Sequence, residues 1–377
     1  MKKSTGILLL LTFFVIILIF VGIFVTLIVY LFQGTTPNLF HAKRLALVKV
    51  EGLIYDAQDW INQIEEYQED DTIKGIVLRV DSPGGAVGPS QELYHTIIRA
   101  RDKYGKVIVA SFGDLAASGG YYIACGADRI VSSPGCLTGS IGVYAKFLQA
   151  KDLMEKIGIN YETVKAGKYK DFGSIDRPLT DEERKMMQGV IDDTYSQFVE
   201  AVANGRKKSL TDLLLHWNPK DNPPVYPFAP EVVDQIVSFQ KKYKNKIEAS
   251  SASVKHASAS IRSVSGNVEE EDDDINVQTA KIEPAIPDQE TLIALTKAIA
   301  DGKVYTGRQA KEIALVDQLG TQKDAIDLAA KLVGIEGKPT VIEKKKRELG
   351  WLDLISQGAS LFTKERVFSP IQYRFPY

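Results

Sequence analysis

An apolar segment near the N-terminus constrains the fold of this chain most strongly. Residues 6–32 carry no charged side chain and are almost entirely hydrophobic. At about 1.5 Å per residue, a helix of this length spans roughly 40 Å, more than the roughly 30 Å hydrocarbon core of a bilayer. The segment is longer than the apolar part of a cleavable signal peptide, and no small-residue cleavage site follows it. The sequence therefore predicts a retained transmembrane signal anchor rather than a buried core helix.

The residues that flank this segment predict its orientation. Lys2 and Lys3 lie immediately before it, which favours a cytoplasmic N-terminus. Lys43 and Arg44 follow on the other side, but they lead into a large domain, for which the charge rule is weaker. We therefore expect the rest of the chain to be extracytoplasmic.

Composition excludes several classes of protein. The 377-residue chain has 46 basic and 48 acidic residues and a formal net charge of −2, which gives no electrostatic reason to expect a nucleic-acid partner. Cys125 and Cys136 are too few for a disulfide scaffold, so two buried thiols are favoured, with a disulfide between them left open. No run of ligand residues has the spacing of a metal site, and we expect neither a metal nor another cofactor.

From Leu45 onward, short apolar runs alternate with segments of helical periodicity. Such alternation indicates an α/β fold with largely parallel strands. A capping box at Thr180 and Glu183 predicts a long helix that fades near Gly205. Other helices are predicted at 90–105, 118–126 and 323–334, with an amphipathic segment at 351–362. The predicted strands are 45–55, 74–80, 106–112, 128–133, 161–167 and 339–345.

An acidic, weakly hydrophobic stretch divides the domain. Six acidic residues follow one another from Glu269 to Asp274, and a block of like charge with few apolar neighbours is typical of disorder. We therefore expect an insertion between two parts of one domain. The predicted organisation is a cytoplasmic end at 1–5, the anchor at 6–32, a linker at 33–44, the domain's first part at 45–208, the insertion at 209–290, its second part at 291–345, and a C-terminal helix and tail at 346–377.

Ser118 is the first candidate for chemistry. It lies in GDLAASGGYYIACGAD (113–128), between two alanines and two glycines, where a partner can approach the backbone closely. The alternative is that this small serine only fills a tight contact between a helix and a strand. A serine nucleophile needs a base, which is usually histidine.

The histidines are poor candidates for that base. The chain has four, at His41, His95, His216 and His256, and none lies in a loop at the end of a predicted strand. A lysine can replace histidine if burial lowers its pKa from about 10.4 to about 7–8. The sequence therefore favours a lysine near small or hydroxyl-bearing residues.

Four short motifs occur in a characteristic order: DSPGG (81–85), AASGGYY (116–122), TGSIGV (138–143) and GKYKD (167–171). Together they resemble the signal peptide peptidase A family of membrane-anchored bacterial serine proteases, peptidase family S49. The resemblance implies a ClpP/crotonase-like fold of repeated ββα units behind one transmembrane helix. It also implies a location in the cell membrane and assembly into a homo-oligomeric ring. The resemblance covers about 45–208 and 291–336, whereas the stretch between them departs from the compact family pattern.

The motif positions imply the roles of individual residues. By resemblance, Ser118 is the nucleophile, Lys170 is the general base and Ser140 orients Lys170. The N–H of Gly85 would donate to the oxyanion. The N–H of Gly119, next to the nucleophile, is the natural second donor.

Two neighbours of Lys170 need an interpretation. Asp171 would raise the pKa of an adjacent lysine, but neighbouring residues of an extended segment point in opposite directions, so we expect Asp171 to face away. Lys168 is expected to be an exposed surface residue.

The predicted function is hydrolysis of hydrophobic peptides, such as remnant signal peptides, by a Ser-Lys endopeptidase. One alternative is an inactive membrane scaffold of the same fold, against which the presence of both Ser118 and Lys170 argues. The other is an acyl-CoA enzyme of the crotonase type, which an extracytoplasmic location disfavours because CoA is cytoplasmic.

Overall fold

The computed structural model describes residues 13–14, 16–27, 43–216, 233–245, 247–248, 287–344 and 371–374. The chain divides into two units, residues 1–43 and residues 44–377. In the first unit, the described helical residues carry exposed apolar side chains. None of the helices that the structure describes is long and apolar enough to cross a bilayer. The predicted anchor at 6–32 extends beyond the described residues on both sides.

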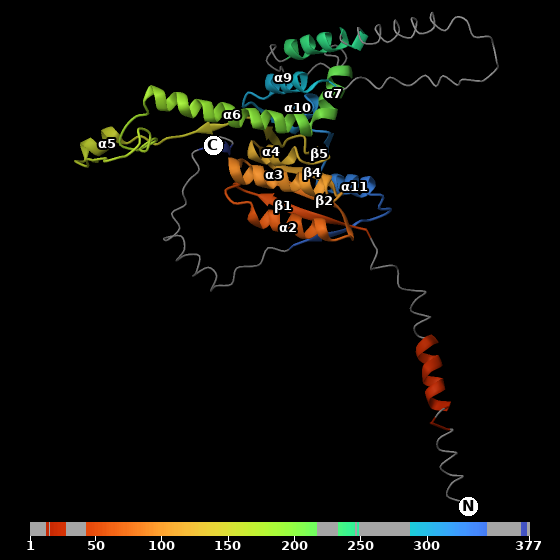
Figure 1. The fold of residues 1–377 in the computed structure, drawn as a ribbon. Helices are drawn as coiled ribbons and strands as arrows, with labels where there is room; N and C mark the ends of the chain where they lie inside the picture. The colour runs from red at the N-terminus through yellow and green to blue at the C-terminus, as the bar shows by residue number, and fades with distance from the viewer. Residues whose placement is uncertain are drawn as a thin grey trace, which may run out of the picture. The chain divides into compact units, whose positions relative to one another are not determined.

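A mostly parallel sheet forms the centre of the second unit (Figure 1). Its main path runs in the order β10-β1-β2-β4-β5-β9, and every pairing along this path is parallel. The end of β4 turns from β5 to pair with β6, which in turn pairs antiparallel with β8. The predicted α/β class is therefore confirmed. The strands are β1 (Arg44–Glu51), β2 (Ile73–Ser82), β4 (Val107–Ala117), β5 (Arg129–Ser132), β6 (Leu137–Gly139), β8 (Val304–Thr306), β9 (Gln318–Leu319) and β10 (Thr340–Glu343).

Helices cover both faces of this sheet because successive side chains of a buried strand point to opposite sides. On β1, Leu45 and Leu47 pack with the alanines of α11 (Gln322–Leu332). Ala46 and Val48 point to the other face and join the larger core. That core is covered by α2 (Gln58–Glu69), α3 (Val87–Asp102) and α4 (Gly119–Ala124).

A long helix joins this body to an arm. The C-terminal half of α6 (Asp181–Gly205) is buried against α4 and α9 (Gln289–Ile299). Its N-terminal half is largely exposed and, with α5 (Lys151–Lys156), projects from the body in Figure 1. We call residues 146–192 the arm. The predicted capping box at Thr180 and Glu183 is present. Helices α7 (Lys207–His216) and α10 (Gly307–Glu312) and the helical residues 233–245 also belong to this body, so the core continues into the segment expected to be an insertion.

A second, smaller sheet lies beside the first. It has the order β3-β11-β7, and both pairings are antiparallel. The strands are β3 (Gly84–Ala86), β7 (Tyr144–Ala145) and β11 (Ile371–Arg374). A strand from the C-terminal tail therefore lies between two strands from the middle of the chain.

Most predicted elements are present, and one strand prediction is wrong. The predicted strands at 45–55, 74–80, 106–112, 128–133 and 339–345 correspond to β1, β2, β4, β5 and β10. Residues 161–165 form no regular structure, and Val164 is 94% exposed. The β-branched residues there have no neighbouring strand to pair with, and propensity alone does not make a strand. The acidic run and the segment at 351–362 lie outside the described residues.

The two cysteines are buried free thiols. Burial raises the pKa of Cys125 to about 12 and that of Cys136 to about 11. The disulfide that the sequence left open is not formed.

Candidate active site

Ser118 occupies a strained turn between β4 and α4. Its φ of 54° and ψ of −118° are rare for a residue with a side chain. Backbone hydrogen bonds hold the turn from both ends: its N–H donates to the carbonyl of Gly139 and its carbonyl accepts from the N–H of Tyr122, both at 2.8 Å. The side chain is fully buried and its Oγ has no hydrogen-bond partner. A serine held in a strained strand-to-helix turn is the arrangement of a nucleophile elbow.

Gly85 and Gly119, the two predicted oxyanion donors, lie together beside Ser118. A Cβ placed on Gly119 would lie 3.1 Å from the backbone nitrogen of Gly85 and 2.7 Å from Oγ of Ser90. A Cβ on Gly85 would lie 2.2 Å from the carbonyl oxygen of Ile54. Neither position has room for a side chain, so both positions require glycine.

The N–H of Gly85 has a defined direction. Gly84 accepts a hydrogen bond from the N–H of Ile54, and Ala86 donates one to the carbonyl of Ile54. Because backbone groups alternate along a strand, the N–H of Gly85 points to the opposite edge of β3. That edge faces β11, with Tyr373 opposite Gly85.

Ser140 leaves the sheet at the same edge as Ser118. Ala117 and Gly139 are paired across β4 and β6, so the serine that follows each strand lies at corresponding positions. Ser140 is 6% exposed, has a φ of 50°, and donates its N–H to the carbonyl of Lys303 at 2.7 Å. The structure therefore brings Ser118, Ser140, Gly85 and Gly119 into one region.

Lys170 is not part of this region within the single chain. It lies in the turn between α5 and α6, and it is exposed. Since Oγ of Ser118 has no hydrogen-bond partner, the predicted pair is not hydrogen-bonded. The structure thus brings the predicted nucleophile and the two predicted oxyanion donors together, without the predicted base.

The charged side chains close to Lys170 in sequence form ion pairs with other residues. The carboxylate of Asp171 is paired with Lys165 and with Arg177. Residues 168–173 form turns, whereas the sequence predicted an extended segment there. Lys168 is exposed, as expected, and pairs with Glu182. The carboxylate closest to Lys170 in sequence is therefore held by two cations.

Comparisons with known proteins decide the family. The model of peptidase family S49 matches residues 100–215 and 290–336, which include Ser118, Ser140 and Lys170. A candidate protease of Synechocystis sp. is 30% identical over 295 residues, covering 78% of this chain and 76% of that protein. The chain belongs to peptidase family S49. It is a serine protease of that family.

Other relatives agree with this family. A candidate protease of Methanocaldococcus jannaschii is 29% identical, covering 91% of this chain and 86% of that protein. A candidate signal peptide peptidase of Enterococcus faecium is 29% identical, covering 84% and 69% respectively. Among solved structures, a membrane-bound stomatin-specific protease aligns with a TM-score of 0.39 and 11% identity over 81% of this chain and 99% of that chain, too low a similarity to support an inference.

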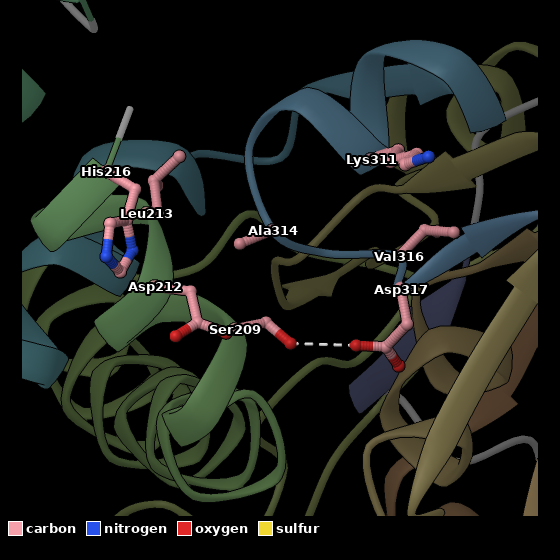
Figure 2. A pocket seen from close by; sticks show the side chains of 8 residues that line it. All are labelled: Ser209, Asp212, Leu213, His216, Lys311, Ala314, Val316 and Asp317. Atoms are coloured by element: carbon pink, nitrogen blue, oxygen red, sulfur yellow. Dashed lines mark hydrogen bonds between the residues drawn. The ribbon is translucent and has the colours of Figure 1, made fainter. Parts of the chain in front are cut away.

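In this S49 protease, neither histidine in the described part of the chain is hydrogen-bonded to Ser118. His95 packs edge-on against Tyr94, with ring centroids 5.3 Å apart. His216 lines an open pocket of about 350 Å³ between α7 and the segment after α10 (Figure 2). None of the predicted catalytic residues lines this pocket. His41 and His256 lie outside the described residues.

The wall of that pocket contains a buried ion pair. Arg206 donates to both carboxylate oxygens of Asp317, at 2.9 and 2.6 Å, and Oγ of Ser209 donates to Asp317 at 2.7 Å. Desolvation raises the pKa of Asp317, but the charge and hydrogen bonds of Arg206 outweigh it and leave the pKa below its usual value. Both oxygens of the carboxylate are hydrogen-bonded internally, and the pair fixes the junction between α6 and α7 to the segment before β9. Within the described residues, no cluster of side chains could hold a metal ion.

Proposed function

We propose that this protein is a membrane-anchored endopeptidase that cleaves hydrophobic peptides, such as remnant signal peptides, with Ser118 and Lys170. The carrying observation is the buried, unpartnered hydroxyl of Ser118 on a strained turn beside Gly85 and Gly119. The proposal also includes a ClpP/crotonase-like arrangement of the domain and the anchor at residues 6–32. The candidate signal peptide peptidase among the relatives supports the substrate class.

In the proposed reaction, neutral Lys170 removes the proton of Ser118 as Oγ attacks the scissile carbonyl. The N–H groups of Gly85 and Gly119 receive the negative charge that develops on the carbonyl oxygen. Lys170 then gives the proton to the amine that leaves as the peptide bond breaks. The neutral lysine next takes a proton from a water molecule, whose oxygen attacks the acyl-enzyme, and it returns that proton to Oγ of Ser118 as the acyl–Oγ bond breaks. Ser140 holds the lysine through its hydroxyl. Lys170 must therefore be desolvated when it acts, because burial favours the neutral amine.

The exposed position of Lys170 leads to a proposal about assembly. The arm carries exposed apolar side chains that the single chain leaves uncovered, among them Leu148, Leu153, Ile157 and Val164. Such a surface is typical of a protein–protein contact. We propose that copies of the chain associate through their arms, as in the predicted ring, so that Lys170 of one copy reaches Ser118 of another.

The substrate is proposed to bind as an extended strand. The N–H of Gly85 points from the edge of β3, and the structure shows that edge pairing with an antiparallel strand. A peptide at this edge gains main-chain hydrogen bonds and presents a carbonyl to Gly85. Extended apolar segments near the membrane satisfy this requirement.

The test measures cleavage of an apolar signal-sequence peptide between pH 6 and 10 by the detergent-solubilised full chain. Ser118→Ala and Lys170→Ala are each expected to lose activity by about 10⁴-fold or more, because the groups act as a unit. The wild-type rate should rise with an apparent pKa well below 10. An active Lys170→Ala variant would show that another group is the base.

A mixing experiment tests the assembly. Inactive Ser118→Ala and Lys170→Ala chains are dissociated, mixed and reassembled. If the dyad forms between copies, mixed assemblies contain sites with both residues intact, and activity should reappear. If each chain supplies both residues to its own site, the mixture stays inactive and the proposal of exchange between copies is wrong.

A further inference from the structure

Arg177 connects the turn that carries Lys170 to the start of α6. Its Nε donates to the carboxylate of Asp171 at 2.9 Å, and Nη2 donates to the carbonyl of the same residue at 3.2 Å. On its other side, the guanidinium binds both carboxylate oxygens of Glu183, at 2.8 and 2.6 Å. One side chain thus bridges the residue next to Lys170 and the third residue of α6.

The α6 end of this bridge is well fixed. Glu183 is 2% exposed and also accepts from the N–H of Thr180 at 2.9 Å, within the capping box. The turn is also supported from the side of α5, where the N–H of Ala150 donates to the carbonyl of Ile175 and Phe147 packs edge-on against Phe172. Arg177 is therefore one of two charged connections between a rigid helix start and the Lys170 turn, the other being the pair of Lys168 and Glu182.

The charges around Lys170 are paired with one another. Asp171 binds Lys165 and Arg177, Glu182 binds Lys168, and Glu183 binds Arg177. Hydrogen bonds from Arg177 and then from Lys165 hold the pKa of Asp171 well below its usual range. On the Ser118 side, the proposed partners are the uncharged hydroxyls of Ser118 and Ser140. The titratable or charged groups on the turn, on α5 and on the start of α6 are Lys146, Lys151, Asp152, Glu155, Lys156, Tyr161, Glu162, Lys165, Lys168, Tyr169, Asp171, Asp176, Arg177, Asp181, Glu182, Glu183, Arg184 and Lys185.

We propose that Arg177 is a positioning residue for Lys170: it fixes the Lys170 turn to α6 and holds the carboxylate of Asp171 away from the lysine. This inference rests on the proposed function, in which Lys170 must be neutral to act. Asp171 adjoins Lys170 in sequence and is the carboxylate nearest to it along the chain. With Arg177 in place, that carboxylate is bonded elsewhere.

Loss of Arg177 should therefore change the titration of the base. In Arg177→Gln, Asp171 keeps Lys165 on Oδ1, but its Oδ2 loses Arg177 and becomes able to pair with Lys170. An opposite charge within hydrogen-bonding distance raises the pKa of a lysine by about one unit or more. The pH–rate profile should move to higher pH by about one unit, and kcat/KM near pH 7 should fall about tenfold, with little change in KM.

The second variant separates this role from a structural one. In Arg177→Gln/Asp171→Asn the competing carboxylate is absent, so the midpoint of the profile should return to the wild-type value. Asp171→Asn alone should not raise the midpoint. Arg177→Lys keeps the charge but loses the two-sided guanidinium contact, and it should give an intermediate shift. Arg99→Gln is the matched control, because Arg99 pairs with Glu65 across α2 and α3 and lies in the body rather than on the arm.

The experiment uses the full chain in detergent, with kcat and KM measured across pH 6 to 10 and thermal unfolding followed for every variant. An Arg177→Gln variant with the wild-type profile overturns the inference, provided that Lys170→Ala is inactive. The inference is also overturned if Arg177→Gln loses activity and the double variant does not return the midpoint of the pH–rate profile to the wild-type value. That result would show that Arg177 only supports the fold. An active Lys170→Ala variant would instead overturn the proposed function, and this inference with it.

Discussion

The backbone N–H of Ser118 donates to the carbonyl of Gly139 at 2.8 Å, directly beyond the last paired residues of β4 and β6. The bond ties together the two strand ends from which Ser118 and Ser140 emerge. Both serines have positive φ values, 54° and 50°, so both are held in sparsely populated conformations by the same sheet edge. The proposed nucleophile is thus positioned by rigid strands, and its place does not depend on Lys170. We expect Lys170→Ala to fold as the wild type does.

Gly85→Ala should abolish most activity. Its Cβ would lie 2.2 Å from the carbonyl oxygen of Ile54, a backbone atom, so β3 has to move away from Ile54. That movement displaces the N–H of Gly85, and loss of one oxyanion donor costs a factor of about 10² to 10³ in kcat. The measurement is kcat with an apolar peptide, together with the thermal unfolding midpoint.

Gly88→Ala is the matched control for that variant. Gly88 lies three residues away in the first turn of α3, and a Cβ there meets no atom within 4 Å. Activity should be unchanged, and helix propensity favours alanine by about 1 kcal/mol. A Gly85→Ala protein as active as Gly88→Ala would remove Gly85 from the proposed oxyanion hole.

The sequence allowed much of the central sheet and Ser118 to be predicted. Strands such as β2 and β4 are buried on both faces, so they appear as continuous apolar runs that periodicity detects. Ser118 and its glycines were recognisable because close backbone contact restricts side-chain size. These features depend on residues that are close together in the sequence, so patterns in the sequence reveal them.

The position of Lys170 and the role of the tail could not be predicted in the same way. The turns at 168–173 depend on ion pairs with Arg177 and Lys165, and no periodic pattern reports them. Strand β11 is four residues long and pairs with residues 84–86, almost the whole length of the domain away in sequence. The strand expected at 161–167 failed for the converse reason, since its local propensity has no partner strand.

Removal of residues 371–377 should improve substrate binding. Strand β11 occupies the edge of β3 to which the N–H of Gly85 points, with Tyr373 opposite Gly85. A tethered strand competes at an effective concentration in the roughly millimolar range. The truncated protein should therefore show a several-fold lower KM for an extended peptide, with kcat unchanged or higher.

Synthetic peptides provide the control for the truncation. A peptide of residues 366–377 should inhibit the truncated protein competitively. The same peptide with Tyr373→Pro should inhibit less, because proline removes the N–H at the position opposite Gly85. Equal inhibition by both peptides, or an unchanged KM after truncation, would show that β11 does not compete with substrate.

The buried pair of Arg206 and Asp317 should contribute strongly to stability. The side chain of Arg206 is 2% exposed and that of Asp317 is 16% exposed, and Asp317 also accepts from the N–H of Ile130 at 2.7 Å. Removal of one partner leaves a buried charge without compensation, which costs about 3–5 kcal/mol. Arg206→Met should lower the free energy of unfolding in urea by this amount.

An exposed pair supplies the comparison. Lys344 binds Glu66 at 2.9 Å, and both side chains are more than half exposed. Lys344→Ala should change the free energy of unfolding by less than about 1 kcal/mol. If Arg206→Met costs no more than Lys344→Ala, the Arg206–Asp317 pair does not stabilise the junction between α6 and α7.

Acid should weaken the start of α6 through Glu183. Hydrogen bonds from Arg177, and then from the N–H of Thr180, lower the pKa of Glu183 to about 2. A carboxyl whose pKa is lower in the folded than in the unfolded state stabilises the fold fully above the unfolded value, about 4.3. This contribution is lost as pH falls toward 2. The difference in free energy of unfolding between wild type and Glu183→Gln should therefore be largest above pH 5 and shrink between pH 4.5 and 2, measured by urea unfolding at each pH. A difference that stays constant over this range would contradict the assignment of Glu183 as the carboxylate bound by Arg177.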